Sequence, residues 1–152
     1  AAKEAYGGVD ILDNNVGIGS NKSVVDEDPA FWDEIMRVNV RSMFLMSKYA
    51  VPAMAARGGG AIVNVSSISA LRPRGLTAYS TSKGAVIALS RAMAVDHAKD
   101  GIRVNCVAPG PVYTPMVIRD GNACGLMMIS GLMPDPENGM SAWGQSHEST
   151  PF

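Results

Sequence analysis

The stretch Gly60-Ala61-Ile62-Val63-Asn64-Val65-Ser66-Ser67 decides the fold class. Its centre, residues 61–65, is a β-branched run with the length and character of a buried strand, and it ends at two serines. A glycine triplet at 58–60 separates it from the preceding segment. A strand that is apolar for nearly its whole length is typical of a parallel sheet with covered faces.

Two helical patterns flank this strand. An Asp-Pro pair at 28–29 forms an N-cap signal, and the apolar spacing that follows predicts a helix over about 29–56. A second helix is predicted over about 78–99, with Gly101 as its stop signal. The predicted core faces carry Phe31, Ile35, Val38, Leu45 and Tyr49 in the first helix and Val86, Leu89 and Met93 in the second.

Two further strands complete the pattern. Val9, Ile11 and Leu12 form an apolar run that ends at Asn14-Asn15 and enters a loop. The third strand covers 102–107 and is closed by Ala108-Pro109-Gly110. Strands alternating with helices predict an α/β fold, a partial Rossmann-type doubly wound parallel sheet with helices on both faces. Ligands of such sheets bind beyond the carboxyl ends of the strands, where the polar clusters of this sequence lie.

Composition narrows the functional class. The 152 residues, 47% hydrophobic, suffice for one domain with a core. Thirteen basic and fourteen acidic residues give a net charge of -1, which argues against nucleic acid or a membrane surface as partner and favours a small molecule. Two cysteines are too few for a disulfide framework, so a cytoplasmic location is expected. Neither His97 nor His147 supports a metal site.

Tyr79 and Lys83 are the first candidates for chemistry. They stand four residues apart at the start of the second helix, on one face and one turn apart. A lysine ammonium beside a phenol favours the phenolate, which lowers the tyrosine pKa toward neutrality and suits proton exchange with an alcohol or carbonyl. Ser67 could donate a hydrogen bond to the same substrate oxygen. Taken alone, this spacing is more often an ordinary solvated helix face.

Five features in sequence order strengthen that reading. They are Asn14-Asn15-Val16-Gly17, Asn39, Ser66-Ser67, Tyr79-Ser80-Thr81-Ser82-Lys83, and Pro109-Gly110 with Thr114. In order and spacing they resemble the motifs of short-chain dehydrogenases/reductases, over about Ala5 to Met116. The resemblance implies an enzyme that transfers hydride between NAD or NADP and a secondary alcohol or ketone.

The resemblance also assigns roles to individual residues. It implies that Tyr79 is the acid/base, that Lys83 is its electrostatic partner and a ribose ligand, that Ser67 donates to the substrate oxygen, and that Asn39 holds a proton-relay water. The cofactor contacts that it implies are Asn14, Gly17, Tyr79, Lys83, Pro109, Gly110, Val112 and Thr114. It further implies that the two long helices form a homodimer or homotetramer contact.

Three positions depart from the family pattern. Ser67 lies twelve residues before Tyr79, and Ser66 lies at the usual thirteen. Alignment on the strand favours Ser67, with one residue deleted in the following loop and Ser66 kept as the alternative. Val16 replaces the usual alanine of the Asn-Asn-Ala-Gly motif, and Asp13 stands where an apolar strand residue is expected, which is costly if it is buried unpaired.

The two ends also depart from the family pattern. No glycine-rich turn that could hold a pyrophosphate precedes Val9, and the Gly17-Ile18-Gly19 match lacks the third glycine because that position is Lys22. We therefore expect the first strand-helix units, with the residue that selects NAD or NADP, to lie before Ala1. Residues 1–116 are predicted to be the catalytic part and 117–152 a divergent or irregular tail.

A second functional hypothesis follows from these departures. The chain could be a non-catalytic remnant that acts only through subunit association. Nucleotide binding distinguishes the two hypotheses. A sheet without its first strands exposes an apolar edge and face, so residues 1–152 expressed alone are predicted to aggregate and to lack dehydrogenase activity. The substrate stays open among a sugar, a sterol, a 3-oxoacyl thioester and a cyclic diol.

Overall fold

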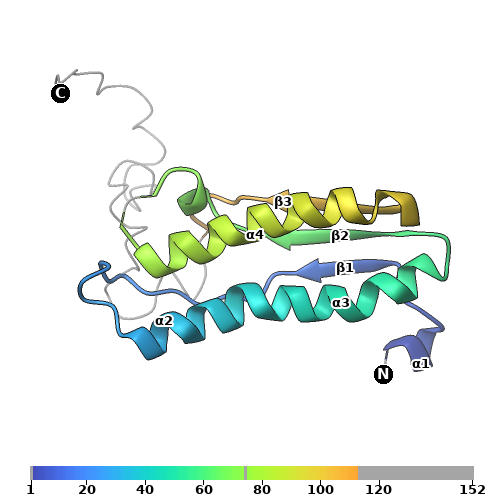
Figure 1. The fold of residues 1–152 in the computed structure, drawn as a ribbon, viewed down its shortest axis with the longest axis horizontal. Helices are drawn as coiled ribbons and strands as arrows, with labels where there is room; N and C mark the ends of the chain where they lie inside the picture. Colours follow the sequence, from blue (N-terminus) through green and yellow to red (C-terminus); the bar gives the residue numbers. More distant parts are fainter. Residues whose placement is uncertain (1, 74, 113–152) are drawn as a thin grey trace, which may run out of the picture. The chain divides into compact units, whose positions relative to one another are not determined.

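The structure is a computed structural model, and it describes residues 2–73 and 75–112. Strands alternate with helices along this part of the chain (Figure 1). Its elements in chain order are α1 (Ala2–Tyr6), β1 (Ile11–Asn14), α2 (Pro29–Met36), the π-helix η1 (Arg37–Arg41), α3 (Ser42–Ala55), β2 (Gly60–Val65), the 3-10 helix η2 (Ile68–Ala70), α4 (Thr77–Asp96), the 3-10 helix η3 (Ala98–Asp100) and β3 (Ile102–Val107).

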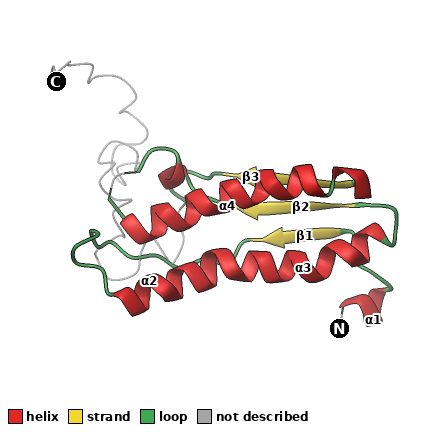
Figure 2. Cartoon of the chain, in the orientation of Figure 1, coloured by secondary structure: helices red, strands yellow, loops and turns green. Residues whose placement is uncertain are grey.

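The sheet has the order β1-β2-β3, and both pairings are parallel. Leu12 is in register with Ile62, which is in register with Val104. Each crossover carries a long helix, and the helices form one layer in front of the strands (Figure 2). The predicted Rossmann-type parallel sheet with flanking helices is confirmed; in the described residues both long helices pack on the same face.

The core lies between that face and the two helices. Leu12, Ile62 and Ile102 point from the three strands into one cluster, against Met54 of α3 and Met93 of α4. Side chains on the other face of the sheet are more exposed, because α3 and α4 do not cover them.

Ile11 and Val107 show this exposure on the outer strands, at 73% and 44% of their surface. Asp13 lies on the same face and is exposed as well. The burial cost that its charge would carry therefore does not arise in the described residues.

The long upstream helix begins as predicted. The carboxylate of Asp28 accepts hydrogen bonds from the backbone N–H groups of Ala30 at 2.8 Å and Phe31 at 3.0 Å, and Pro29 takes the first helical position. The helix is not a regular α-helix throughout, because Arg37–Arg41 forms a π-helical turn around Asn39. The sequence gives no periodic signal for that insertion. Asn39 within it bonds to Ile18 and Ser82, which are distant in the chain.

Glycines align the amino ends of β2 and β3. Gly59 has a φ of +136°, and a Cβ at this position would lie 2.4 Å from the carbonyl oxygen of Gly101. Gly101 is itself left-handed at φ +71°. Because only glycine allows this backbone approach, the strand starts are held together without side chains.

A row of polar side chains crosses the otherwise apolar core. The amide of Asn14 donates to Asn64 Oδ1 at 2.8 Å, and Asn64 Nδ2 donates to Ser90 Oγ at 2.9 Å. Ser47 Oγ accepts from Asn14 at 3.3 Å, and Ser90 Oγ donates to the Val86 carbonyl at 2.7 Å. This buried row joins β1 and β2 to α3 and α4, so it fixes which part of each helix covers each strand.

We expect Asn64→Ala to lower the free energy of unfolding by about 2 kcal/mol, because the donor of Asn14 and the hydroxyl of Ser90 lose a buried partner. Asn105→Ala is the matched control, since Asn105 is exposed on the neighbouring strand and should change stability by less than about 0.5 kcal/mol. Urea unfolding followed by circular dichroism measures both. Equal losses from the two variants would contradict a structural role for the polar row.

Candidate functional site

The site lies at the carboxyl ends of the three strands, which point the same way (Figure 1). The loops after β2 and β3 are tied together here: Ser66 N donates to the Val107 carbonyl at 2.8 Å, and Ile68 N donates to the Pro109 carbonyl at 2.9 Å. Because α4 starts close to this edge, its first two turns overlie the end of β2. This brings Tyr79 and Lys83 to the loops that follow the strands.

Lys83 is held to the end of β2 at both its side chain and its backbone. The Nζ donates to the Val65 carbonyl at 2.9 Å, and the Lys83 carbonyl accepts from Ser66 Oγ at 2.7 Å. Lys83 is only 3% exposed. An ammonium has three N–H donors, so the described contacts leave two of them for other acceptors.

Burial sets the protonation behaviour of Lys83. Removing the ammonium from water lowers the pKa of Lys83 below its ordinary value, and a smaller opposing effect comes from the nearby Cys106. A buried cation with a lowered pKa at the end of a parallel strand is an arrangement found at functional sites.

Tyr79 lies beside this ammonium. The Lys83 Nζ is 5.7 Å from the centroid of the Tyr79 ring, and the ring is partly exposed. Two glycines allow the loop after β1 to approach the pair closely. A Cβ on Gly19 would lie 3.1 Å from Tyr79 Cδ2, and one on Gly17 would lie 3.1 Å from Lys83 Nζ. The loop therefore forms a wall that side chains at these two positions would push away.

The two serines at the end of β2 have different surroundings. Ser66 Oγ donates to the backbone of α4, at the Lys83 carbonyl, so its hydroxyl proton is committed. Ser67 Oγ accepts from Ser69 N at 3.1 Å. Within the described residues the Ser67 hydroxyl only accepts, which leaves its proton available to a substrate oxygen. This difference favours Ser67 over Ser66 as the donor.

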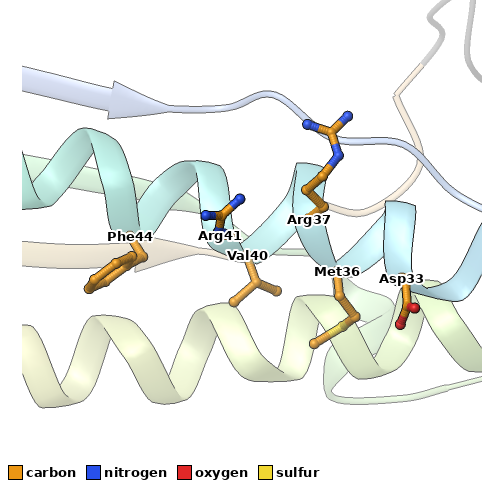
Figure 3. A pocket seen from close by; sticks show the side chains of 6 residues that line it. All are labelled: Asp33, Met36, Arg37, Val40, Arg41 and Phe44. Carbon is orange, nitrogen blue, oxygen red and sulfur yellow. The ribbon is translucent and has the colours of Figure 1, made fainter.

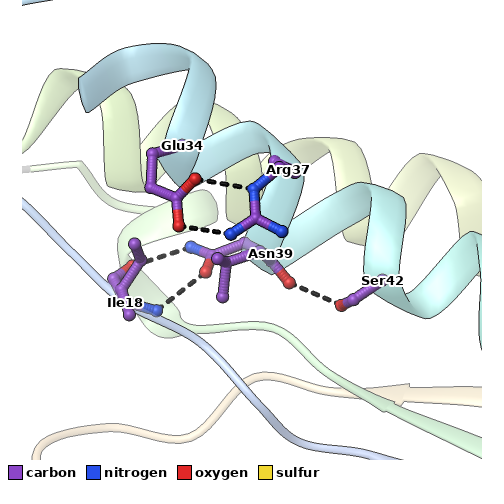
Figure 4. A network of polar contacts seen from close by, with 6 residues as sticks. Ile18, Glu34, Arg37, Asn39 and Ser42 are labelled. Atoms are coloured by element: carbon purple, nitrogen blue, oxygen red, sulfur yellow. Dashed lines mark hydrogen bonds and ion pairs between the residues drawn. The ribbon is translucent and has the colours of Figure 1, made fainter. Parts of the chain in front are cut away.

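Asn39 connects the π-helix to the loop after β1 (Figure 4) and also to α4. Its Oδ1 accepts from Ile18 N at 2.8 Å, and its Nδ2 donates both to the Ile18 carbonyl at 2.8 Å and to Ser82 Oγ at 2.9 Å. The side chain is fully buried. The π-helical turn places this side chain, and such turns are frequent at functional sites.

The other predicted cofactor contacts that the structure describes lie at the same edge of the sheet, and they differ in how buried they are. The amide of Asn14 is buried in the polar row and is already used by Asn64 and Ser47. Pro109, Gly110 and Val112 follow β3 and are exposed, and a Cβ on Gly110 would meet no atom within 4 Å. Thr114 lies outside the described residues.

A match to a family model adds to this geometry. Residues 1–124 match the model described as short chain dehydrogenase. The chain belongs to the short-chain dehydrogenase family.

Two curated relatives within the short-chain dehydrogenase family have moderate sequence identity to this chain. The 2-(R)-hydroxypropyl-CoM dehydrogenase of Xanthobacter autotrophicus is 44% identical over 120 residues, which are 76% of this chain and 48% of that protein. The galactitol 2-dehydrogenase (L-tagatose-forming) of Cereibacter sphaeroides is 44% identical over 122 residues, 78% of this chain and 48% of that protein. The chain thus spans about half the length of the curated relatives it matches.

A solved short-chain dehydrogenase/reductase structure from Burkholderia xenovorans matches the fold with a TM-score of 0.75 at 41% identity. The match covers 78% of this chain and 47% of that one. An alcohol dehydrogenase structure of the same family from Sinorhizobium meliloti gives a TM-score of 0.72 at 38% identity, over 76% and 46% of the two chains. These matches confirm the fold class and the family resemblance seen in the sequence.

Two other kinds of feature are not found in residues 2–73 and 75–112. No helix in this part of the chain has both the length and the apolar character to cross a membrane. Nor does this part gather three or more His, Cys, Asp or Glu side chains in a possible metal site.

Two buried polar residues, Ser82 at the site and Asn64 in the core, are not among the site residues predicted from the sequence. Ser82 accepts from Asn39 and donates to the Tyr79 carbonyl at 2.7 Å. Its spacing of three from Tyr79 places it on the same helix face, which was a usable signal. Asn64 lies within the predicted apolar strand, and a lone amide in such a run itself indicates a buried hydrogen-bonding network.

The buried state of Lys83 generates a pH prediction. A lysine pKa that is lower in the folded than in the unfolded protein means that the unfolded state binds more protons in the alkaline range. The free energy of unfolding should therefore rise with pH as folded Lys83 loses its proton, up to the unfolded pKa of about 10.4. Lys83→Met should remove this contribution.

Lys48→Met is the control, because Lys48 is exposed on α3. Urea unfolding of the cofactor-free protein between about pH 7 and 10 compares the two variants with the wild type. The expected result is a smaller rise with pH in Lys83→Met than in Lys48→Met. A smaller rise in Lys48→Met, or equal slopes, would contradict the lowered pKa.

Proposed function

We propose that the complete gene product carrying this chain is an NAD(P)-dependent oxidoreductase that interconverts a secondary alcohol and a ketone. The observation that carries the proposal is the placement of Lys83, which is buried, bonded to β2 and 5.7 Å from the ring of Tyr79. Family membership supports the reaction class. Since the chain spans about half the length of its curated relatives, the activity is proposed for the complete product.

Tyr79 is the proposed acid/base. In the oxidation direction its phenolate takes the proton of the substrate hydroxyl, and in the reduction direction its phenol gives that proton back. The buried ammonium of Lys83 favours the phenolate, because a positive charge close by stabilises the anion in a poorly solvated site.

Ser67 and Asn39 complete the proposed tetrad. Ser67 would donate its hydroxyl proton to the substrate oxygen and so stabilise the charge that develops there. Both amide protons of Asn39 are used by Ile18 and Ser82, so the part in the proton relay that we propose for Asn39 runs through the π-helical turn that it holds. Asn39 then acts on proton transfer by fixing the backbone of this turn.

The residues present fit the nicotinamide-ribose part of a cofactor. Lys83 has ammonium donors beyond its bond to Val65, and Gly17 keeps the space beside Nζ free of a side chain. Pro109, Gly110 and Val112 line the neighbouring loop, with Thr114 the next proposed contact along the chain. A bound nicotinamide supplies or accepts the hydride. For Asn14 we propose an indirect part, holding the end of β1 through Asn64.

The relatives narrow the substrates to be tested first. The names of the two dehydrogenases identify a hydroxypropyl compound and galactitol as their substrates. A hydroxyl-bearing small molecule is therefore the first choice for this protein, and the choice between NAD and NADP is decided by measurement. The division into a catalytic part at 1–116 and a tail at 117–152, and the cytoplasmic location, stay predictions.

We also propose that the long helices pair with a second copy of the chain. A surface pocket runs along α2, η1 and α3, and Met36, Val40 and Phe44 point from it toward α4 (Figure 3). Arg37 and Arg41 lie at its rim. Phe44 is 48% exposed, and an apolar strip with a charged rim is typical of a subunit contact. A dimer or tetramer by light scattering would support this partner.

We expect Tyr79→Phe to reduce turnover at least about 100-fold while cofactor affinity changes little, because only the proton-transferring oxygen is lost. The assay supplies NAD or NADP with 2-propanol, galactitol and a cyclic diol, and follows the absorbance of the reduced nicotinamide. Tyr49→Phe is the control, since Tyr49, which the sequence pattern predicts on the core face, is instead exposed on α3 away from the strand ends. Wild-type turnover in Tyr79→Phe would remove this residue from its role.

Nucleotide titration in the same preparations tests the non-catalytic alternative. NADH or NADPH should raise the melting temperature of the complete product and change the nucleotide fluorescence. A protein that binds neither nucleotide at millimolar concentration, and oxidises none of the alcohols, would favour the association-only hypothesis.

The serine assignment gives a further expectation. Ser67→Ala should lower turnover by about 100-fold, the usual effect of losing one preorganised donor to a reacting oxygen. Ser66→Ala should act mainly on stability, because its hydroxyl bonds to the Lys83 carbonyl. Turnover and melting temperature of the two variants are compared side by side. If Ser66→Ala caused the larger loss of turnover, Ser66 would be the substrate donor.

A further inference from the structure

Ser82 links two residues of the site that lie on different helices, Asn39 and Tyr79. Its side chain is fully buried, and its Oγ accepts from Asn39 Nδ2 at 2.9 Å while donating to the Tyr79 carbonyl at 2.7 Å. Asn39 in turn holds both backbone groups of Ile18. One hydroxyl therefore joins the π-helical turn, the loop after β1 and the first turn of α4.

The start of α4 is held partly by bonds to other segments of the chain. The residue before the helix, Leu76, is left-handed at φ 57°, and no side chain caps the helix at this end. Thr77 N reaches the Lys22 carbonyl only at a long 3.4 Å. The first N–H groups of a helix have no partner within it, so this turn depends on tertiary bonds for its position.

We propose that Ser82 is a positioning residue for the reaction, holding Tyr79 in place relative to the loop wall and Lys83 through its bond to Asn39. This inference rests on the proposed function. A hydroxyl that accepts an amide proton and donates to a carbonyl is polarised in both bonds, which strengthens the chain from Asn39 to Tyr79. Loss of the hydroxyl would remove the bond between Asn39 and the part of α4 that carries the reacting phenol, and small displacements of a reacting group lower turnover steeply.

The same helix provides a matched control in Ser90. Ser90 is also buried, accepts from an asparagine Nδ2 at 2.9 Å, and donates to a carbonyl of its own helix at 2.7 Å. It lies two turns beyond Ser82 and far along the helix from Tyr79. Removing either hydroxyl deletes the same kinds of bonds, so only position relative to Tyr79 differs between the two variants.

The test measures kcat, KM, cofactor Kd and melting temperature of the complete product with its nicotinamide and the best alcohol of the panel above. Ser82→Ala should lower kcat about 10-fold with KM and cofactor Kd within about 2-fold of the wild type, because the bonds lost act on the geometry of the phenol. Ser90→Ala should lower the melting temperature by a similar amount and leave kcat within about 2-fold.

Two further variants separate the hydroxyl from its volume. Ser82→Thr keeps a hydroxyl that can make the same bonds, and should restore kcat to within about 3-fold. Ser82→Cys keeps the approximate volume with a weak donor, and should lose kcat as Ser82→Ala does. If Ser82→Ala does not fold, the kcat values of Ser82→Thr and Ser82→Cys test the role of the hydroxyl in its place.

Equal kcat in Ser82→Ala and Ser90→Ala, or wild-type kcat in Ser82→Cys, would overturn the role of Ser82 alone. The proposed function, and the role of Ser82 with it, would be overturned by either of two results. The first is a wild-type protein that oxidises no alcohol, and the second is a Tyr79→Phe variant that keeps wild-type turnover. The two failures are therefore distinguished by the wild-type and Tyr79→Phe measurements.

Discussion

The carboxamide of Asn39 is the interaction on which the arrangement of the site depends. Its oxygen and nitrogen hold the backbone of Ile18 in both directions, and the nitrogen also reaches Ser82. A buried amide left without these partners would be strongly unfavourable, so the helix adopts a π-helical turn that presents Asn39 to all of them. The bonds of Asn39 to Ile18 thus hold the loop that contains Gly17 and Gly19. This loop forms one side of the surroundings of Lys83 and Tyr79.

A second amide, Asn64, does for the body of the fold what Asn39 does for the site. Both residues are completely buried, and each links a helix to a neighbouring segment through a serine of α4. The core between α3, α4 and the sheet is otherwise apolar and could tolerate sliding of one helix along another. The amides of Asn39 and Asn64 bond to two serines spaced along α4 and oppose that sliding, because any displacement would leave buried donors without acceptors.

Much of this could be predicted from the sequence, and the exceptions share one physical cause. The Asp28 cap, the helix lengths and the third strand follow from local signals, and the structure has them nearly as expected. The π-helical turn at Asn39, the commitment of Asn14 to Asn64 and the bridging role of Ser82 depend on partners distant in the chain. Period and capping rules describe neighbours within a few residues, so they carry no information on such pairs.

The strand order β1-β2-β3 is the same as the order along the chain. Each strand therefore finds its partner one helix away, and no strand must wait for a distant segment before it can pair. Over the part of the chain that the structure describes, a parallel sheet built in this way can grow by one strand-helix unit at a time as a ribosome releases it. The helix that carries Tyr79 and Lys83 packs against both β2 and β3, so its docking is completed only when β3 has emerged and paired with β2.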